Sequence, residues 1–246
     1  MAPLNLSQRP AKDEPVSPLP FIGLMIVLLG AGLLIIGVLL GFSPAQLVNS
    51  LLDRALVASS AQTTWFVTRA AGLMAYLLVW LSTVWGLAVS SKVFDGALHR
   101  AFTYDFHQFI SLLSIAFVVI HLVVLLFDQY QPFTLAQILV PFTAPYRSVW
   151  VGVGTIGLYL TLIVSFTFYI RKWIGQKTFR LIHFASYLAF AGSALHGLLS
   201  GTDSPLWSVQ AMYLVTAISV VFLTVYRIVM SAANKRRRVA AGAQRA

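Results

Sequence analysis

Four histidines are the residues of this sequence best placed to do chemistry, because they lie inside long apolar stretches. His107 and His121 are fourteen residues apart in "YDFHQFISLLSIAFVVIHLVVLLF", and His183 and His196 are thirteen apart in "FRLIHFASYLAFAGSALHGLL". An ionisable side chain inside a membrane is costly, so it generally faces the protein interior and serves a function. The fifth histidine, His99, lies in a polar loop and is interpreted as an ordinary surface residue.

The spacings put the four histidines at two matched depths. Fourteen helical residues rise about 21 Å and thirteen rise about 20 Å. The two stretches are separated by one further apolar stretch, so their helices should run parallel, which places His107 level with His183 and His121 level with His196. We call these the inner pair and the outer pair, after the side of the membrane that each is predicted to face. Two pairs of imidazoles in a bundle core are what two bis-histidine hemes require.

The thirteen-residue spacing poses a geometric problem for the helix that carries His183 and His196. On an ideal helix it turns the second residue about 140° away from the first. That helix must therefore bend, change its local pitch, or offer its histidines to hemes displaced sideways. Gly192 and Ser193 form the kind of pair at which helices kink, and they predict a bend just before His196.

Three other interpretations of the histidines stay open at this point. A membrane histidine can simply form a hydrogen bond between helices. A zinc or copper site would have two imidazoles at each level and no Cys, Asp or Glu nearby, which is a thin ligand set. A proton relay would need acidic residues to continue it, and none lies at mid-membrane.

The elements that must position these histidines are transmembrane helices. The chain has 246 residues, of which 59% are hydrophobic, 10% are charged and none is cysteine. A membrane crossing needs about 20 mostly apolar residues, and six stretches qualify: 21–42, 65–90, 106–127, 148–170, 181–202 and 204–226. We predict an all-α, polytopic membrane protein, a six-helix bundle with heme sites between the third and fifth helices. The first stretch is interpreted as a retained helix, with a signal peptide as the alternative.

Basic residues predict the orientation of this bundle. Fourteen of the seventeen Lys and Arg residues fall on the side that carries both termini, which by the positive-inside rule is the cytoplasm. Residues 1–20 then form a polar cytoplasmic tail, 21–230 the transmembrane domain and 231–246 a basic cytoplasmic tail, which we expect to be disordered. The net charge of +10 is explained by topology, so nucleic acid is not an expected partner.

The histidine set resembles that of the ferric reductase-like transmembrane domain superfamily. This group includes ferric reductases, the membrane half of NADPH oxidases and the heme subunit of the periplasmic methionine sulfoxide reductase system. The resemblance covers roughly residues 60–230. Its carriers are the unequal spacings of fourteen and thirteen, "WFVTRAAGLMAYLLVWLSTVWGLAVS" and "LVPFTAPYRSVWVGVGTIGLYL". It implies two b-type hemes, one ligated by each pair, that carry single electrons from the cytoplasmic to the outer side of an inner membrane.

Two arginines are candidates for binding the heme propionates. Arg69 lies near the outer end of its helix at about the depth of the outer pair, and Arg180 lies three residues before His183. Arginine binds carboxylates well. The alternatives are that Arg69 extends to the outer membrane interface and that Arg180 only follows the positive-inside bias. Aromatic residues between the two levels are expected to pack the helices and insulate the hemes: Phe117, Tyr187 and Phe190.

The electron donor is expected to be a separate molecule. About 16 residues follow residue 230 and contain no GxGxxG motif, so a flavoprotein, a membrane quinol or another subunit is expected to supply the electrons. The outer acceptor stays open between ferric chelates, oxygen and a reductase partner. The competing function is a non-enzymatic scaffold or assembly subunit of a larger respiratory or photosynthetic complex. A proton-coupled transporter fits less well, because it predicts acidic residues at mid-membrane.

Overall fold

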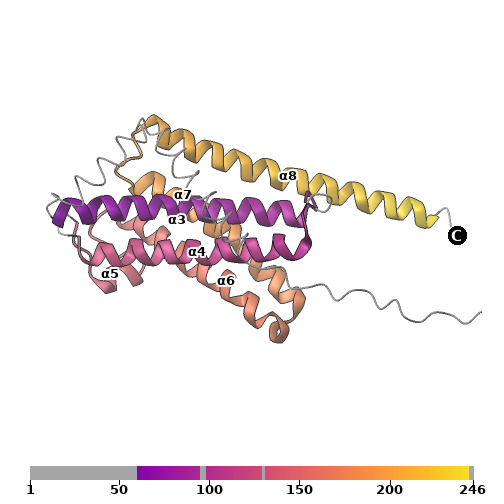
Figure 1. Ribbon diagram of the computed structural model, residues 1–246, viewed down its shortest axis with the longest axis horizontal. Helices are drawn as coiled ribbons and strands as arrows, with labels where there is room; N and C mark the ends of the chain where they lie inside the picture. The colour runs from indigo at the N-terminus through magenta and orange to yellow at the C-terminus, as the bar shows by residue number, and fades with distance from the viewer. Residues whose placement is uncertain (1–59, 95–97, 129–130, 244–246) are drawn as a thin grey trace, which may run out of the picture. The chain divides into compact units, whose positions relative to one another are not determined.

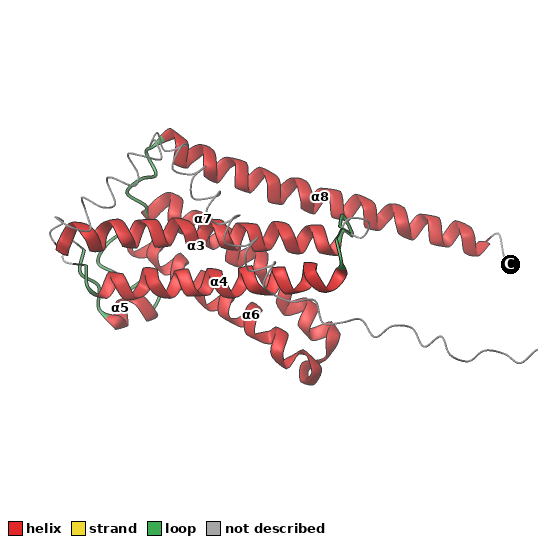
Figure 2. Ribbon diagram, viewed as in Figure 1, coloured by secondary structure: helices red, strands yellow, loops and turns green. Residues whose placement is uncertain are grey.

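The computed structural model describes residues 60–94, 98–128 and 131–243 of the chain. These residues form helices and no strands (Figure 2). The predicted first helix, 21–42, lies outside the described residues.

Two long helices begin the described part and lie side by side. Helix α3 spans Ser60–Ser90 and helix α4 spans Arg100–Leu126 (Figure 1). They run antiparallel, since Gly72 near the start of α3 meets His121 near the end of α4, and Gly86 meets His107. They correspond to the predicted helices 65–90 and 106–127. A buried cluster joins α3 to helix α7, Ala185–Ser200, and helix α8, Trp207–Ala243. It consists of Tyr76, Val79, Leu87, Phe190, Val209, Tyr213 and Val220.

The next helical run is longer than predicted and folds back on itself. Helix α6 spans Ser148–His183 and helix α7 spans Ala185–Ser200, with one non-helical residue inside α6, Gly175 (φ 79°, ψ 158°). A left-handed φ is open to glycine without steric cost, and the chain reverses there: Gly157 faces Ser193 across the α6–α7 contact. The stretch predicted as a loop between helices 148–170 and 181–202 is therefore helical on both sides of a single-residue reversal.

Helix α7 is unbroken at Gly192 and Ser193, where a bend was expected. Both residues lie inside the regular part of α7, where Gly192 allows the close approach of α6. The interruption lies at Phe184, directly after His183, where backbone N–H groups bond to carbonyls three residues back. Such 3₁₀ bonds tighten the turn, so the local pitch changes between His183 and His196 without a glycine.

The last helix also extends further than predicted. Helix α8 spans Trp207–Ala243, so the tail expected to be disordered over 231–246 is helical through Ala243. Alanine, lysine and arginine dominate this segment, and they are among the strongest helix formers. The segment contains no proline, and its first glycine is Gly242. Intrinsic preference therefore continues the helix beyond its apolar part.

The connection between α4 and α6 is held against the end of α7. It contains the short helix α5, Leu135–Leu139, which starts with a capping box formed by Thr134 and Gln137. Further along, the Tyr146 hydroxyl donates to the Ser200 carbonyl over 3.1 Å. Arg147, in a left-handed conformation at the start of α6, donates to the Leu199 carbonyl. A cation at a helix C-terminus satisfies carbonyls that lack helical partners.

The described helices form a multi-pass membrane protein. Four stretches are long and apolar enough to cross a bilayer: Thr63–Ser90, Arg100–Leu126, Ser148–Ser200 and Trp207–Ala233. The third has 53 residues, and its reversal at Gly175 divides it into two antiparallel parts. Large apolar side chains cover the exposed side of α8, among them Leu214, Val215, Ile218, Val221 and Phe222. Such a surface suits lipid and would be costly in water.

Candidate functional site

The structure brings the four histidines together in two pairs. The ring centres of His107 and His183 are 6.1 Å apart, with 72° between the ring planes. Those of His121 and His196 are 6.4 Å apart, with 77° between the planes. In each pair one ring comes from α4 and the other from the α6–α7 run. Helices far apart in the sequence thus place two imidazoles opposite each other at two separate levels.

These separations suit one metal ion held between two rings. A metal–imidazole nitrogen bond is about 2 Å long, and a ring nitrogen lies about 1 Å from the ring centre. Two imidazoles on opposite sides of one metal therefore have ring centres about 6 Å apart. Both pairs match this value. Within the described ranges no group of three or more His, Cys, Asp or Glu side chains gathers, and the described residues offer two imidazoles at each level.

Hydrogen bonds fix which nitrogen of each outer-pair ring carries the proton. His121 Nδ1 lies 2.8 Å from the Thr68 carbonyl oxygen, and His196 Nδ1 lies 3.0 Å from the Trp150 carbonyl oxygen. A carbonyl oxygen only accepts, so Nδ1 of each ring must be the donor. The lone pair is then on Nε2, the nitrogen that is free to bind a metal.

The rings of the inner pair make weaker hydrogen bonds than those of the outer pair. His107 Nδ1 lies 3.4 Å from Ser82 Oγ, which in turn lies 2.7 Å from Ser111 Oγ. His183 Nδ1 is buried and has no hydrogen-bond partner among the described residues. Its ring instead stacks on Phe179, with 5.4 Å between ring centres. The two levels therefore share a ring separation and differ in the groups behind the rings.

Glycines on the neighbouring helices make room for three of the four rings. A Cβ atom at Gly72 would lie 3.0 Å from His121, and one at Gly86 would lie 3.0 Å from His107. Gly72 and Gly86 are fourteen residues apart, as are the two histidines that they face. This repeated spacing was visible in the sequence and was missed. On α6, a Cβ at Gly154 would lie 2.5 Å from Nδ1 of His196.

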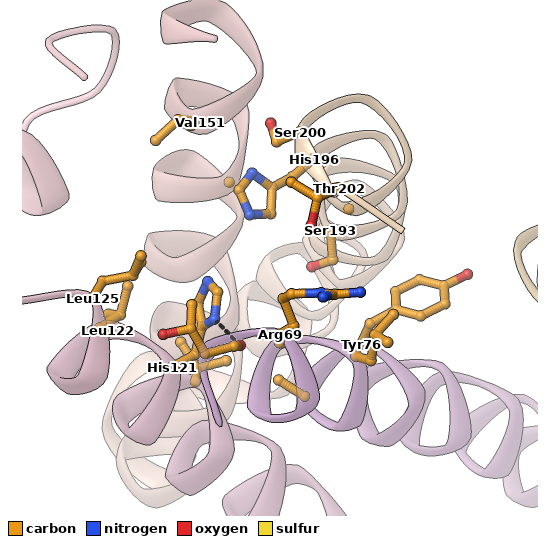
Figure 3. A pocket seen from close by; sticks show the side chains of 18 of the residues that line it. Arg69, Tyr76, His121, Leu122, Leu125, Val151, Ser193, His196, Ser200 and Thr202 are labelled. Atoms are coloured by element: carbon orange, nitrogen blue, oxygen red, sulfur yellow. Dashed lines mark hydrogen bonds between the residues drawn. The ribbon is translucent and has the colours of Figure 1, made fainter. Parts of the chain in front are cut away.

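A cavity of about 240 Å³ extends from the outer pair towards the loops at that end of the helices. His121 and His196 point into it from α4 and α7, and Arg69 and Tyr76 line it from α3 (Figure 3). Two hydroxyls in its wall, Thr68 Oγ1 and Ser200 Oγ, are buried and have no hydrogen-bond partner in the described part of the chain. Buried polar groups without partners are costly, and these two suit a ligand that accepts hydrogen bonds. Heme propionates fit that description.

Arg69 has a partner that the sequence did not predict. Its guanidinium forms an ion pair with Asp203, including a bond of 2.6 Å from Nε to Oδ2. It also stacks on Trp65, with Cζ 3.9 Å from the ring centre. Arg69 lines the cavity of the outer pair. A propionate bound there would share the Arg69 guanidinium with Asp203. The side chain of Arg180 is exposed, and its proposed role at the inner pair stays a prediction.

Removing the Asp203 carboxylate should destabilise the protein. Asp203 and Arg69 are only 18% and 24% exposed, so Asp203→Ala leaves a guanidinium charge that is partly shielded from water. We expect a loss of about 1–3 kcal/mol in the free energy of unfolding, measured as a lower Tm of the detergent-solubilised protein. Asp105→Ala, which removes an exposed carboxylate from α4, should leave Tm nearly unchanged. Equal Tm values for the two variants would contradict this expectation.

The aromatic residues expected between the two levels occupy different environments. Phe190 is buried and stacks on Tyr76, with 6.0 Å between ring centres. Tyr187 packs against the same cluster and stacks on Phe184. Phe117 is half-buried. Tyr76, which no sequence pattern indicated, is the central member, since it also contacts Tyr213 and hydrogen-bonds to Thr216.

Comparison of the chain with protein-family models, with characterised proteins and with solved structures found no match. The resemblance to ferric reductase-like proteins therefore stays a prediction from histidine spacing and the stretches around it.

Proposed function

We propose that this chain is a membrane cytochrome that holds two b-type hemes and passes electrons across the bilayer. His107 and His183 would hold the inner heme, and His121 and His196 the outer heme. The observation that carries the proposal is the ring separation of 6.1 and 6.4 Å in two pairs. If the four histidines only packed between helices, nothing would require both pairs to have the ring-centre separation that suits one metal.

The protein's contribution is to supply ligands, hold them in the correct tautomer and keep water away. When bound, each heme supplies a one-electron iron couple. The carbonyls of Thr68 and Trp150 keep the protons of the outer rings on Nδ1, which leaves Nε2 for the metal. Two imidazoles would hold each heme and would leave no site on the iron for a substrate, and this ligand set favours electron transfer.

The route proposed for the electrons runs from the cytoplasm outward. A separate flavoprotein or a membrane quinol would donate at the inner level, and a ferric chelate, oxygen or a reductase partner would accept at the outer level. The excess of basic residues on one side supports an inner-membrane protein with both termini in the cytoplasm. A six-crossing bundle would combine the described helices with the predicted helix 21–42.

A visible spectrum of the purified protein tests this proposal. The protein should be expressed with ample heme, and spectra should be recorded as isolated and after dithionite, with a pyridine hemochrome assay for heme per chain. We expect low-spin b-type bands and two hemes per chain. A colourless protein would refute the cytochrome and leave a scaffold whose histidines only form hydrogen bonds.

A further inference from the structure

The groups behind the histidine rings differ between the two levels. Both outer rings donate to backbone carbonyls, at 2.8 and 3.0 Å. At the inner level the Nδ1 atom of His107 has only a hydroxyl at 3.4 Å, and that of His183 has no partner among the described residues. A strong bond from Nδ1–H to an acceptor makes an imidazole a more basic ligand. The two imidazoles of the outer pair would therefore be more basic ligands for an iron than those of the inner pair.

The proton of each inner-level hydroxyl can be assigned. Ser111 donates its hydroxyl proton to the His107 carbonyl over 2.8 Å. Ser82, at 2.7 Å from Ser111 Oγ, must then donate its own proton to that oxygen. This leaves a lone pair of Ser82 Oγ as the acceptor for Nδ1–H of His107. Ser82 is thus the group that sets the tautomer of His107, through a long and weak bond.

The two levels also differ in nearby charge, and this difference acts on the iron potentials in the same direction as the difference in ligand basicity. The guanidinium carbon of Arg227 lies 5.9 Å from the ring centre of Phe184, the residue after His183, so a positive charge lies near the inner pair. At the outer level the charge of Arg69 is matched by Asp203. A nearby positive charge favours the reduced form of an iron site, and a more basic ligand favours the oxidised form. Both effects raise the inner potential relative to the outer one.

We propose that the two pairs hold their irons at unequal midpoint potentials, with the inner one higher, and that Ser82 is a positioning residue for His107. This inference rests on the proposed function, because it requires a heme at each level. Reduction adds one electron from an external reductant to each site and converts iron(III) to iron(II). No covalent bond forms or breaks, and the Nδ1 protons stay in place.

An anaerobic redox titration of the full chain, followed at the α-band, tests the order of the potentials. Each heme is measured alone, the inner one in the variant His121→Ala with His196→Ala, and the outer one in the variant His107→Ala with His183→Ala. We expect the inner midpoint to be the more positive of the two. Equal midpoints or the reverse order would overturn the inference. A chain without heme bands would instead overturn the proposed function and the inference with it.

Substitutions at Ser82 test the positioning role. Ser82→Ala removes the acceptor of His107 Nδ1–H, so the inner midpoint should move to a more positive value while the outer midpoint stays unchanged. Ser82→Thr keeps a hydroxyl and should restore the original value. Ser90→Ala is the matched control, because the Ser90 hydroxyl on the same helix donates only to the Leu87 carbonyl. An inner midpoint that is identical in the Ser82→Ala, Ser90→Ala and unmodified proteins would refute the role of Ser82.

Discussion

Replacement of His121 with alanine should halve the heme content of the protein. The outer heme would lose the imidazole supplied by α4, and loss even of a group that only supports a metal ligand typically weakens binding about 10–100-fold. The inner pair lies about 21 Å away along α4 and should keep its heme. The pyridine hemochrome assay, expressed as heme per chain, measures the change. His196→Ala should give the same value, since it removes the opposite ligand.

His99→Ala is the matched control for this experiment. It makes the same chemical change at an exposed histidine directly before α4, and it should leave heme content and spectrum unaltered. Heme content that is unchanged in both His121→Ala and His196→Ala would remove the basis for an outer site, whatever the inner pair binds.

Replacement of Gly154 with alanine should displace His196 and empty the outer site without removing any ligand. The added Cβ would lie 2.5 Å from Nδ1 and 2.7 Å from Cγ of the ring, distances that real Cβ atoms do not adopt. The ring would have to move, and its bond to the Trp150 carbonyl would be lost. We expect outer-heme affinity to fall about 10-fold or more, measured by heme titration of the apoprotein.

Gly157→Ala is the control, because it places the same methyl group one turn further along α6. Its nearest neighbour would be 3.7 Å away, an ordinary contact. We expect normal heme content and near-normal stability for this variant. If Gly154→Ala bound heme as tightly as Gly157→Ala, the position of His196 in this structure would not be the one that ligates.

The level pairing of the histidines followed from the sequence because it depends only on helical rise and on the alternation of helix direction. Those two quantities relate His107 to His183, and His121 to His196, without any knowledge of side-chain contacts. The helix positions followed for the same reason, since the apolar stretches are long and unbroken. The hydropathy pattern of this chain is therefore enough to predict its membrane-spanning helices.

The features that the sequence did not predict depend mostly on contacts between helices that are far apart in the chain. Nothing in the local sequence around Arg69 names Asp203, which is 134 residues away. The break at Phe184 was missed because helices were expected to bend at small residues, whereas Gly192 serves close packing against α6. The helical tail was missed because its charge was weighed and its helix preference was not. The glycines facing the histidines were missed because each was considered singly and their common spacing was not compared.

The distance between the two levels has a consequence for energy conversion. About 21 Å of helix separates His107 from His121, which is about two-thirds of the hydrocarbon thickness of a bilayer. An electron that moved from the inner to the outer level would cross that share of the electric field of the membrane. A full crossing is worth about 2.3 kcal/mol per 100 mV, so this step would be worth about 1.5 kcal/mol per 100 mV. In a cell with a negative interior, the field would drive electrons outward, against the unequal potentials proposed here, and the transfer would discharge the membrane as it proceeds.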